Sequence, residues 1–201
     1  TTLNQSIRAI LAITIPTALF LSLGLEPIIA ILGFDELGTQ LVLWTARAFM
    51  LGLMGHSLIE VGARAFYAQQ DARTPMLVAG LTAVSFLVFG VLLYRGFGAP
   101  GIALANTIAF SLEALILLYL LHRSQKMTLM LGKAIWRIPL GTLIGGVLVN
   151  FGMQIMTQQV SSALWQGVFA AAIMGIGLLA ALPLLWPEIR LIFQIESRVD
   201  D

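Results

Sequence analysis

Cysteine is absent from this chain of 201 residues, which also contains only two histidines. Without cysteine there is no disulfide framework, no thiolate metal site and no cysteine nucleophile. His56 and His122 lie in unrelated settings and do not suggest a metal site. The chain also lacks a Ser/His/Asp arrangement, an HExxH motif and a phosphate-binding loop. We therefore expect no metal, no cofactor and no enzymatic activity.

Charge is scarce as well. Charged residues make up 10% of the chain and hydrophobic residues 59%, whereas soluble domains carry about 25% charged residues. The net charge is +1, and the chain has no basic tract with interleaved aromatics, so we expect no nucleic-acid partner.

Long apolar blocks predict membrane spans, because a helix of about 20 apolar residues crosses a bilayer. Six blocks qualify, which predicts an all-α, polytopic bundle of six transmembrane helices: residues 7–32, 41–69, 76–94, 101–122, 134–156 and 163–186.

Loop charges predict how the spans are oriented, because cytoplasmic loops carry an excess of lysine and arginine. If the loops alternate sides, Arg95 stands alone on one side. The other side receives Arg8, Arg73, Arg123, Lys126, Lys133, Arg137, Arg190 and Arg198. We therefore expect both ends of the chain in the cytoplasm. The chain opens with TTLNQ, without methionine or a signal-peptide pattern, and one interpretation is that it is the C-terminal part of a longer polypeptide.

The second span carries a charged stripe. His56, Glu60 and Arg64 are spaced by four residues and share a helix face, and glutamate before arginine is the favoured order for a helical ion pair. One interpretation is that the pair neutralises itself and that Arg64 extends to the headgroups. The other is that the stripe faces a hydrated cavity and contacts an anionic substrate, because arginine suits bidentate phosphate contact.

Two further charges lie within spans. Arg47 is about 180° around the helix from His56, so it does not belong to the same stripe; it either extends outward or faces a cavity. Glu113 is near the middle of the fourth span and has no opposite charge at i±3 or i±4. A lone intramembrane acid is either protonated or paired with another helix. Its candidate partners are Arg47 and a residue outside this chain.

Two local patterns have simpler interpretations. In DARTP, Asp71 or Thr74 caps the next helix, Arg73 adds a charge, and Pro75 occupies the first helical turn; the alternative is a gating loop. Gly141 and Gly145 form a GxxxG pattern on the fifth span, which permits close helix packing.

The runs RAFYAQQDARTP (residues 64–75) and GFGAPGIALANTIAFSLEALILLYLLHRS (residues 96–124) resemble the MurJ/MviN family of lipid II flippases. That family typically shows R-x-F-Y-A, a D-T-x-T-P turn and G-x-x-G-x-A-L-A. The internal Pro16 and the LEPII ending of the first span are similar too, so the resemblance covers about residues 4–123. Asp71-Ala72 departs from the usual Asp-Thr.

The resemblance implies the last six of fourteen helices of an exporter that moves lipid-linked peptidoglycan precursor across the bacterial cytoplasmic membrane by alternating access. Its partners would be lipid II, membrane lipids and the N-terminal lobe of the same polypeptide, which holds the family's principal cationic residues. The implied organisation is four helices of the C-terminal lobe (1–123), a basic linker (124–133), two helices forming a lipid-tail groove (134–187) and a cytoplasmic tail (188–201).

Two alternatives remain open. One is another exporter of the multidrug/oligosaccharidyl-lipid/polysaccharide superfamily, which the resemblance implies, that moves a different polyprenyl-linked oligosaccharide or a drug. The other is a non-transporting membrane scaffold that binds a partner through the Gly141/Gly145 face. A membrane enzyme is a distant third, because no nucleophile or metal constellation is present.

Overall fold

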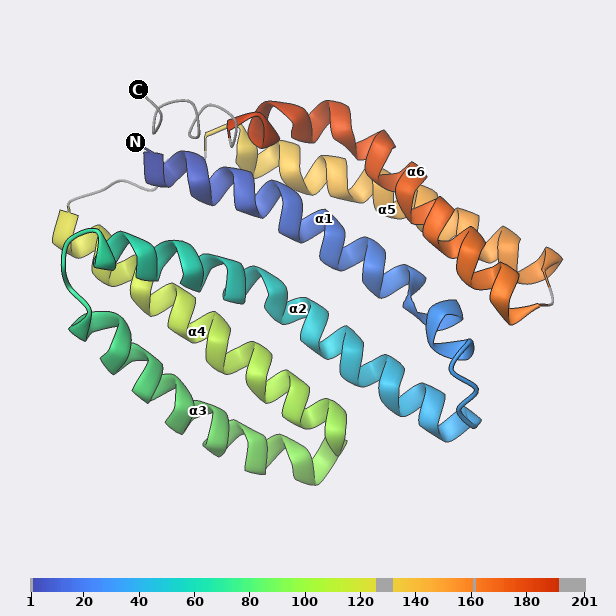
Figure 1. Cartoon of the computed structure of the whole chain (residues 1–201), viewed down its shortest axis with the longest axis horizontal. Coiled ribbons are helices and arrows are strands. Elements are labelled where there is room, and N and C mark those ends of the chain that lie inside the picture. Colours follow the sequence, from blue (N-terminus) through green and yellow to red (C-terminus); the bar gives the residue numbers. More distant parts are fainter. Residues whose placement is uncertain (1, 126–131, 161, 192–201) are drawn as a thin grey trace.

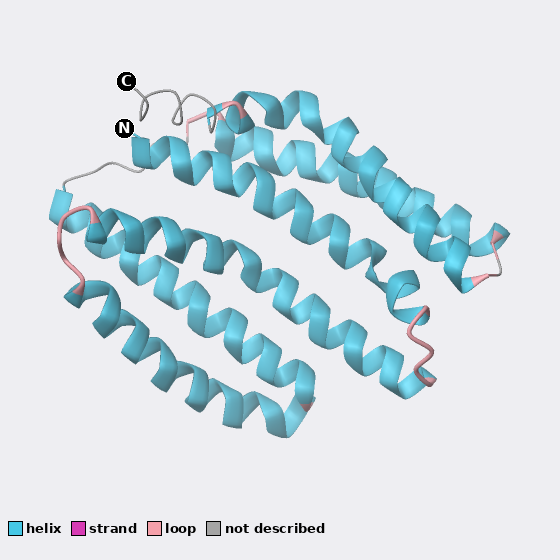
Figure 2. Ribbon diagram, viewed as in Figure 1, coloured by secondary structure: helices cyan, strands magenta, loops and turns pink. Residues whose placement is uncertain are grey.

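The computed structural model describes residues 2–125, 132–160 and 162–191. Throughout these residues the fold is all-helical (Figure 2). The helices are α1 (Thr2–Ala30), α2 (Glu36–Tyr67), α3 (Arg73–Phe97), α4 (Ala99–Gln125), α5 (Ala134–Gln159) and α6 (Ala163–Ile189). Each of the six is long and apolar enough to cross a membrane. The predicted fold class and the six predicted spans are confirmed.

Consecutive helices run in opposite directions, and α1 lies between two groups (Figure 1). On one side α2 packs against α1 and α4, and α3 packs mainly against α4. On the other side α5 and α6 pack against each other and against α1. Among the described helices, α1 is the only one that joins the α5–α6 pair to the rest of the bundle.

Small residues bring α2 and α4 together. A Cβ added at Gly52 would lie 3.3 Å from the Cα of Thr107, and one added at Gly55 would lie 3.1 Å from the backbone of Ser111. The hydroxyl of Thr107 donates to the carbonyl of Ala48 across the same contact at 2.6 Å. Membrane helices associate through such close backbone contacts and hydroxyl bonds, because hydrocarbon supplies no hydrophobic drive between them.

The end of α6 differs from the prediction. The last span was expected to stop at residue 186, ahead of Pro187, and Glu188 was assigned to a cytoplasmic tail. Instead α6 continues through Pro187 to Ile189, and Glu188 is fully buried. Proline is tolerated within membrane helices because neighbouring groups satisfy the freed backbone. Most of the predicted linker and tail, including Lys126 and Arg198, lies outside the described residues.

Candidate functional site

The predicted stripe on α2 divides into two environments. His56 turns toward α4, where its Nε2–H donates to Oδ1 of Asn106 at 3.1 Å and its ring lies 4.4 Å from that of Phe110. Glu60 and Arg64 form the predicted ion pair at 3.4 Å, with side chains 70% and 80% exposed. An exposed pair of this kind adds little stability. Both charged side chains are therefore accessible at the surface of the described helices.

Arg47 lies at the other end of α2 and is turned toward α1. Its Nε donates to the carbonyl of Ser22 at 3.2 Å, its Nη2 lies 3.9 Å from Glu26, and its guanidinium stands 5.4 Å from the centre of the Trp44 ring. Arg47 was one of the two candidate partners of Glu113 from sequence, and the structure shows that it pairs with Glu26 instead. Sequence does not show how α1 and α2 face each other, so it did not predict that Glu26 of α1 lies near Arg47.

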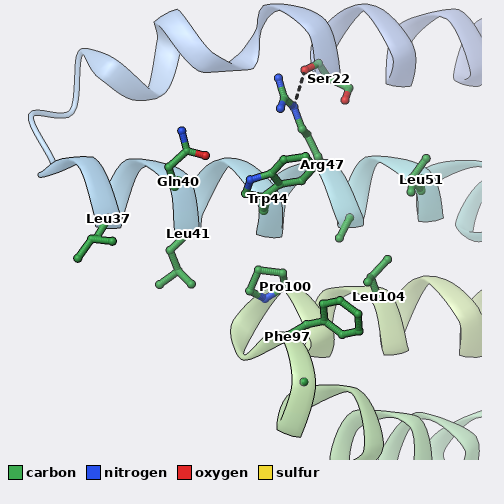
Figure 3. Close-up of a pocket in the computed structure, with 12 residues that line it drawn as sticks. Ser22, Leu37, Gln40, Leu41, Trp44, Arg47, Leu51, Phe97, Pro100 and Leu104 are labelled. Carbon is green, nitrogen blue, oxygen red and sulfur yellow. Dashed lines mark hydrogen bonds between the residues drawn. The ribbon is translucent and has the colours of Figure 1, made fainter.

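Beside Arg47 is an apolar cavity of about 840 Å³ between α2 and the α3–α4 connection. Figure 3 shows the Arg47 guanidinium pointing toward Ser22, whereas Leu41 points in the opposite direction. The cavity is lined by Ser22, Leu37, Gln40, Leu41, Trp44, Arg47, Ala48, Leu51, Gly96, Phe97, Pro100 and Leu104. Its chemistry suits hydrocarbon or an apolar helix face, with one cation at its edge.

Glu113 of α4 is buried, with 6% of its surface exposed. It lines a crevice of about 340 Å³ between α3 and α4, together with Thr82, Asn106 and Phe110. Among the residues that the structure describes, no cation lies within ion-pair distance of its carboxyl group. The crevice thus presents one acid in apolar surroundings, close to the Asn106 side chain that accepts from His56.

The DARTP turn is capped as predicted. One carboxylate oxygen of Asp71 accepts from the backbone N–H groups of Arg73 and Thr74, each at 3.0 Å, and the other accepts from the Thr74 hydroxyl at 2.6 Å. Pro75 is the third residue of α3, within its first turn. The Thr74 hydroxyl is the main reason that the pKa of Asp71 lies below its usual value, and the Thr74 and Arg73 amides and the Arg73 charge lower it further.

Gly141 and Gly145 face the interior of the α1–α5–α6 group. A Cβ on Gly141 would lie 3.3 Å from Leu184 and Leu185 of α6. A Cβ on Gly145 would lie 2.6 Å from the carbonyl oxygen of Gly177 and would also meet the ring of Phe20. This face is already covered by α6 and α1, so the scaffold hypothesis loses the surface on which it depended.

One charged cluster was missed from sequence. Glu188 of α6 accepts from Arg8 of α1 at 2.7 and 2.9 Å, and Arg137 of α5 lies 3.7 Å from its other oxygen. The available signal was an acid within two residues of a span end, on the side where arginines collect. That signal does not identify the partners, because Arg8 and Glu188 are 180 residues apart.

Comparison with known proteins identifies one family. The family model described as lipid II flippase MurJ matches residues 1–175. A probable lipid II flippase MurJ of Rhizobium tropici is 34% identical over 156 residues, which are 73% of this chain and 27% of that protein. Its counterpart in Rhizobium meliloti (strain 1021) is 32% identical over 118 residues, 57% of this chain and 22% of that protein.

A solved structure of lipid II flippase MurJ in an inward closed conformation matches with a TM-score of 0.70 at 22% identity. The match covers 97% of this chain and 39% of that one, and at this identity it shows the fold alone. The chain spans about a quarter of the length of the two Rhizobium relatives. Because the family model matches most of its length, this chain belongs to the lipid II flippase MurJ family of multi-pass bacterial membrane proteins.

Proposed function

We propose that the chain is the C-terminal six-helix part of a lipid II flippase with fourteen helices. The family match over residues 1–175, combined with six membrane-length helices, is the observation that carries the proposal. Its role is transport and not enzymatic catalysis: the protein moves a lipid-linked peptidoglycan precursor for cell-wall synthesis. The remaining helices, which include an N-terminal lobe, belong to the same polypeptide.

Transport of this substrate has to solve a physical problem. Unsatisfied polar and charged groups cost several kcal/mol each in hydrocarbon, so a pyrophosphate-sugar-peptide head does not cross the bilayer unaided. A cavity between two lobes that opens to one side at a time keeps the head hydrated. The exposed Glu60–Arg64 pair suits the edge of such a cavity, because the Arg64 side chain is 80% exposed and guanidinium groups suit bidentate phosphate contact. His56, Arg47 and Glu113 are further candidates for residues that line the cavity or bind the substrate.

The lipid tail needs an apolar surface continuous with the membrane. The division into a four-helix part (1–123) and a two-helix part (134–187) assigns that surface to α5 and α6. Large exposed side chains on their outer faces, including Leu143, Phe151 and Leu179, support the assignment. A crevice of about 280 Å³ between α1, α2 and α5 offers a route from this surface toward the four-helix part.

The orientation follows from the charges at one end of the bundle. Arg8, Arg73, Arg123, Arg137 and Arg190 belong to the ends of helices that meet where α1 begins and α6 ends (Figure 1). We place this end in the cytoplasm, in agreement with the excess of basic residues in cytoplasmic loops. The exposed apolar face of α2, with Leu37, Trp44 and Leu51, then suits contact with the N-terminal lobe or with membrane lipids.

The test is lipid II translocation by the whole polypeptide reconstituted in proteoliposomes. Purified protein with fluorescent lipid II should expose the labelled head on the opposite leaflet, and empty liposomes should not. The same vesicles with another polyprenyl-linked oligosaccharide, or with a cationic drug, test the alternative exporters. Transport of one of those substrates without lipid II movement would replace the proposal, and movement of none of them would refute a transport role.

A further inference from the structure

The Arg8–Glu188–Arg137 cluster joins three helices at one end of the bundle. The Glu188 side chain is fully buried, whereas those of Arg8 and Arg137 are 26% and 37% exposed. Arg8 uses both its Nε and its Nη2 on Oε2 of Glu188, at 2.9 and 2.7 Å. The other oxygen, Oε1, has Arg137 at 3.7 Å but no hydrogen bond among the described residues. The negative charge of Glu188 is therefore compensated mainly by Arg8 of α1 and more weakly by Arg137 of α5.

A buried carboxylate is a poor device for adding stability, because its desolvation offsets much of the attraction. It does restrict geometry, since removing either partner leaves an uncompensated charge in the interior. The surrounding contact between α1, α5 and α6 is formed by apolar side chains such as Ala12, Ile138 and Leu185. Apolar faces tolerate sliding and rotation better than a charge-assisted pair with a fixed direction. The ion cluster thus fixes the register of α6 against α1 and α5 more closely than the apolar packing does.

The cluster lies where the α5–α6 pair is attached to the rest of the bundle, so it can affect how that pair moves relative to the other helices. The α5–α6 pair touches the rest of the described helices only through α1. At the opposite end α6 approaches the residue that directly follows α1: a Cβ added at Gly167 would meet the side chain of Ile31. That second contact is apolar and involves no charge. The Arg8–Glu188 bond is consequently the one ion pair between α1 and α6 within the described residues.

We propose that Arg8, Glu188 and Arg137 are positioning residues that clamp the α5–α6 pair to α1, so that α1 and this pair move as one unit during transport. The transport part of this statement rests on the proposed function, whereas the clamp itself does not. The residues need not touch the substrate. They act by keeping the apolar surface of α5 and α6 aligned with the helix that connects it to α2, α3 and α4.

Distance measurements between spin labels test the clamp without any substrate. The chain has no cysteine, so labels attach at introduced cysteines in a cysteine-free version of the whole protein. One pair, Ile13→Cys with Trp186→Cys, reports on the clamped end, and a second, Ile31→Cys with Leu164→Cys, reports on the opposite end. All four positions are exposed.

Glu188→Gln keeps the shape of the side chain and removes its charge. It should shift the first distance distribution to longer and broader values and leave the second unchanged. Arg8→Gln should do the same, and it retains Arg137 beside Glu188 if the first variant does not fold. Arg190→Gln and Glu60→Gln remove exposed charges and should alter neither distribution. An unchanged first distribution in both Glu188→Gln and Arg8→Gln would overturn the clamp.

Lipid II translocation by the same proteins separates the two proposals. Slower translocation by Glu188→Gln than by Arg190→Gln, together with the longer distance, supports a positioning role in transport. Normal translocation despite the longer distance would overturn that role. If the unmodified protein moves no lipid II, the proposed function fails, while the distance shift still establishes the clamp.

Discussion

A single methyl group at Gly145 should destabilise the bundle measurably. The Cβ of Gly145→Ala would lie 2.6 Å from the carbonyl oxygen of Gly177 and would meet the buried ring of Phe20. The carbonyl oxygen of Gly177 belongs to the helix backbone and cannot rotate away from the added methyl group, so α5 and α6 must move apart. Overpacking of this kind costs about 1–3 kcal/mol, whereas Gly→Ala in a helix interior gains at most about 1 kcal/mol. We expect a net loss of about 1–2 kcal/mol, because the contact is with backbone.

Two glycines serve as controls in the same protein. A Cβ at Gly80 on α3 meets nothing within 4 Å, so Gly80→Ala should be neutral or slightly stabilising. A Cβ at Gly24 would lie 2.5 Å from Sδ of Met174, a flexible side chain that adapts at lower cost than backbone. The expected order of stability is therefore Gly80→Ala, then Gly24→Ala, then Gly145→Ala.

Thermal melting of the purified protein in detergent measures this order. A change of 1 kcal/mol shifts the melting temperature of a domain of this size by about 2–4 °C. Gly145→Ala should therefore melt clearly below the unmodified protein, and Gly80→Ala at or above it. Equal melting temperatures for Gly145→Ala and Gly80→Ala would refute the close contact between α5 and α6.

Three further predictions concern other parts of the chain. Asp71→Asn should lower the melting temperature at neutral pH, and the difference should disappear in acid: the pKa of Asp71 is lowered in the fold, so its stabilisation is complete above its usual value of 3.8 and is lost as the pH falls through the lower folded value. Arg64→Ala should reduce lipid II translocation in proteoliposomes while membrane insertion stays normal, with Arg95→Ala at the opposite end as the control; full activity of Arg64→Ala would remove Arg64 from the site. Thr107→Val should lower stability by about 1 kcal/mol through loss of its bond to Ala48, which a melting curve would reveal.

Local chemistry explains what was predictable from sequence. Long apolar blocks define membrane helices because backbone groups in hydrocarbon must be satisfied within the segment. The Glu60–Arg64 pair and the Asp71 cap join residues three or four positions apart, so helical geometry alone brings them together. The resemblance carried by residues 64–75 and 96–124 pointed to the family that the comparisons then identified.

Other features depended on which helix faces which. In a soluble protein the polar side of a helix marks the outside, but in a membrane bundle both the lipid-facing and the interior faces are apolar. The sequence therefore does not show that His56 turns toward Asn106 or that Arg47 reaches Glu26. It likewise does not show that Gly145 meets Gly177.

Six membrane helices, their local caps and ion pairs, and the family resemblance were predictable, because they depend on hydropathy, motifs and residues a few positions apart. The partners of the isolated charges became visible in the folded chain, because those partners are distant in sequence. Glu188 is the clearest example: its sequence context near Pro187 indicated a tail, whereas folding buries it against Arg8 from the other end of the chain. Burying a carboxylate is costly, and for Glu188 the cation that offsets this cost comes from another helix.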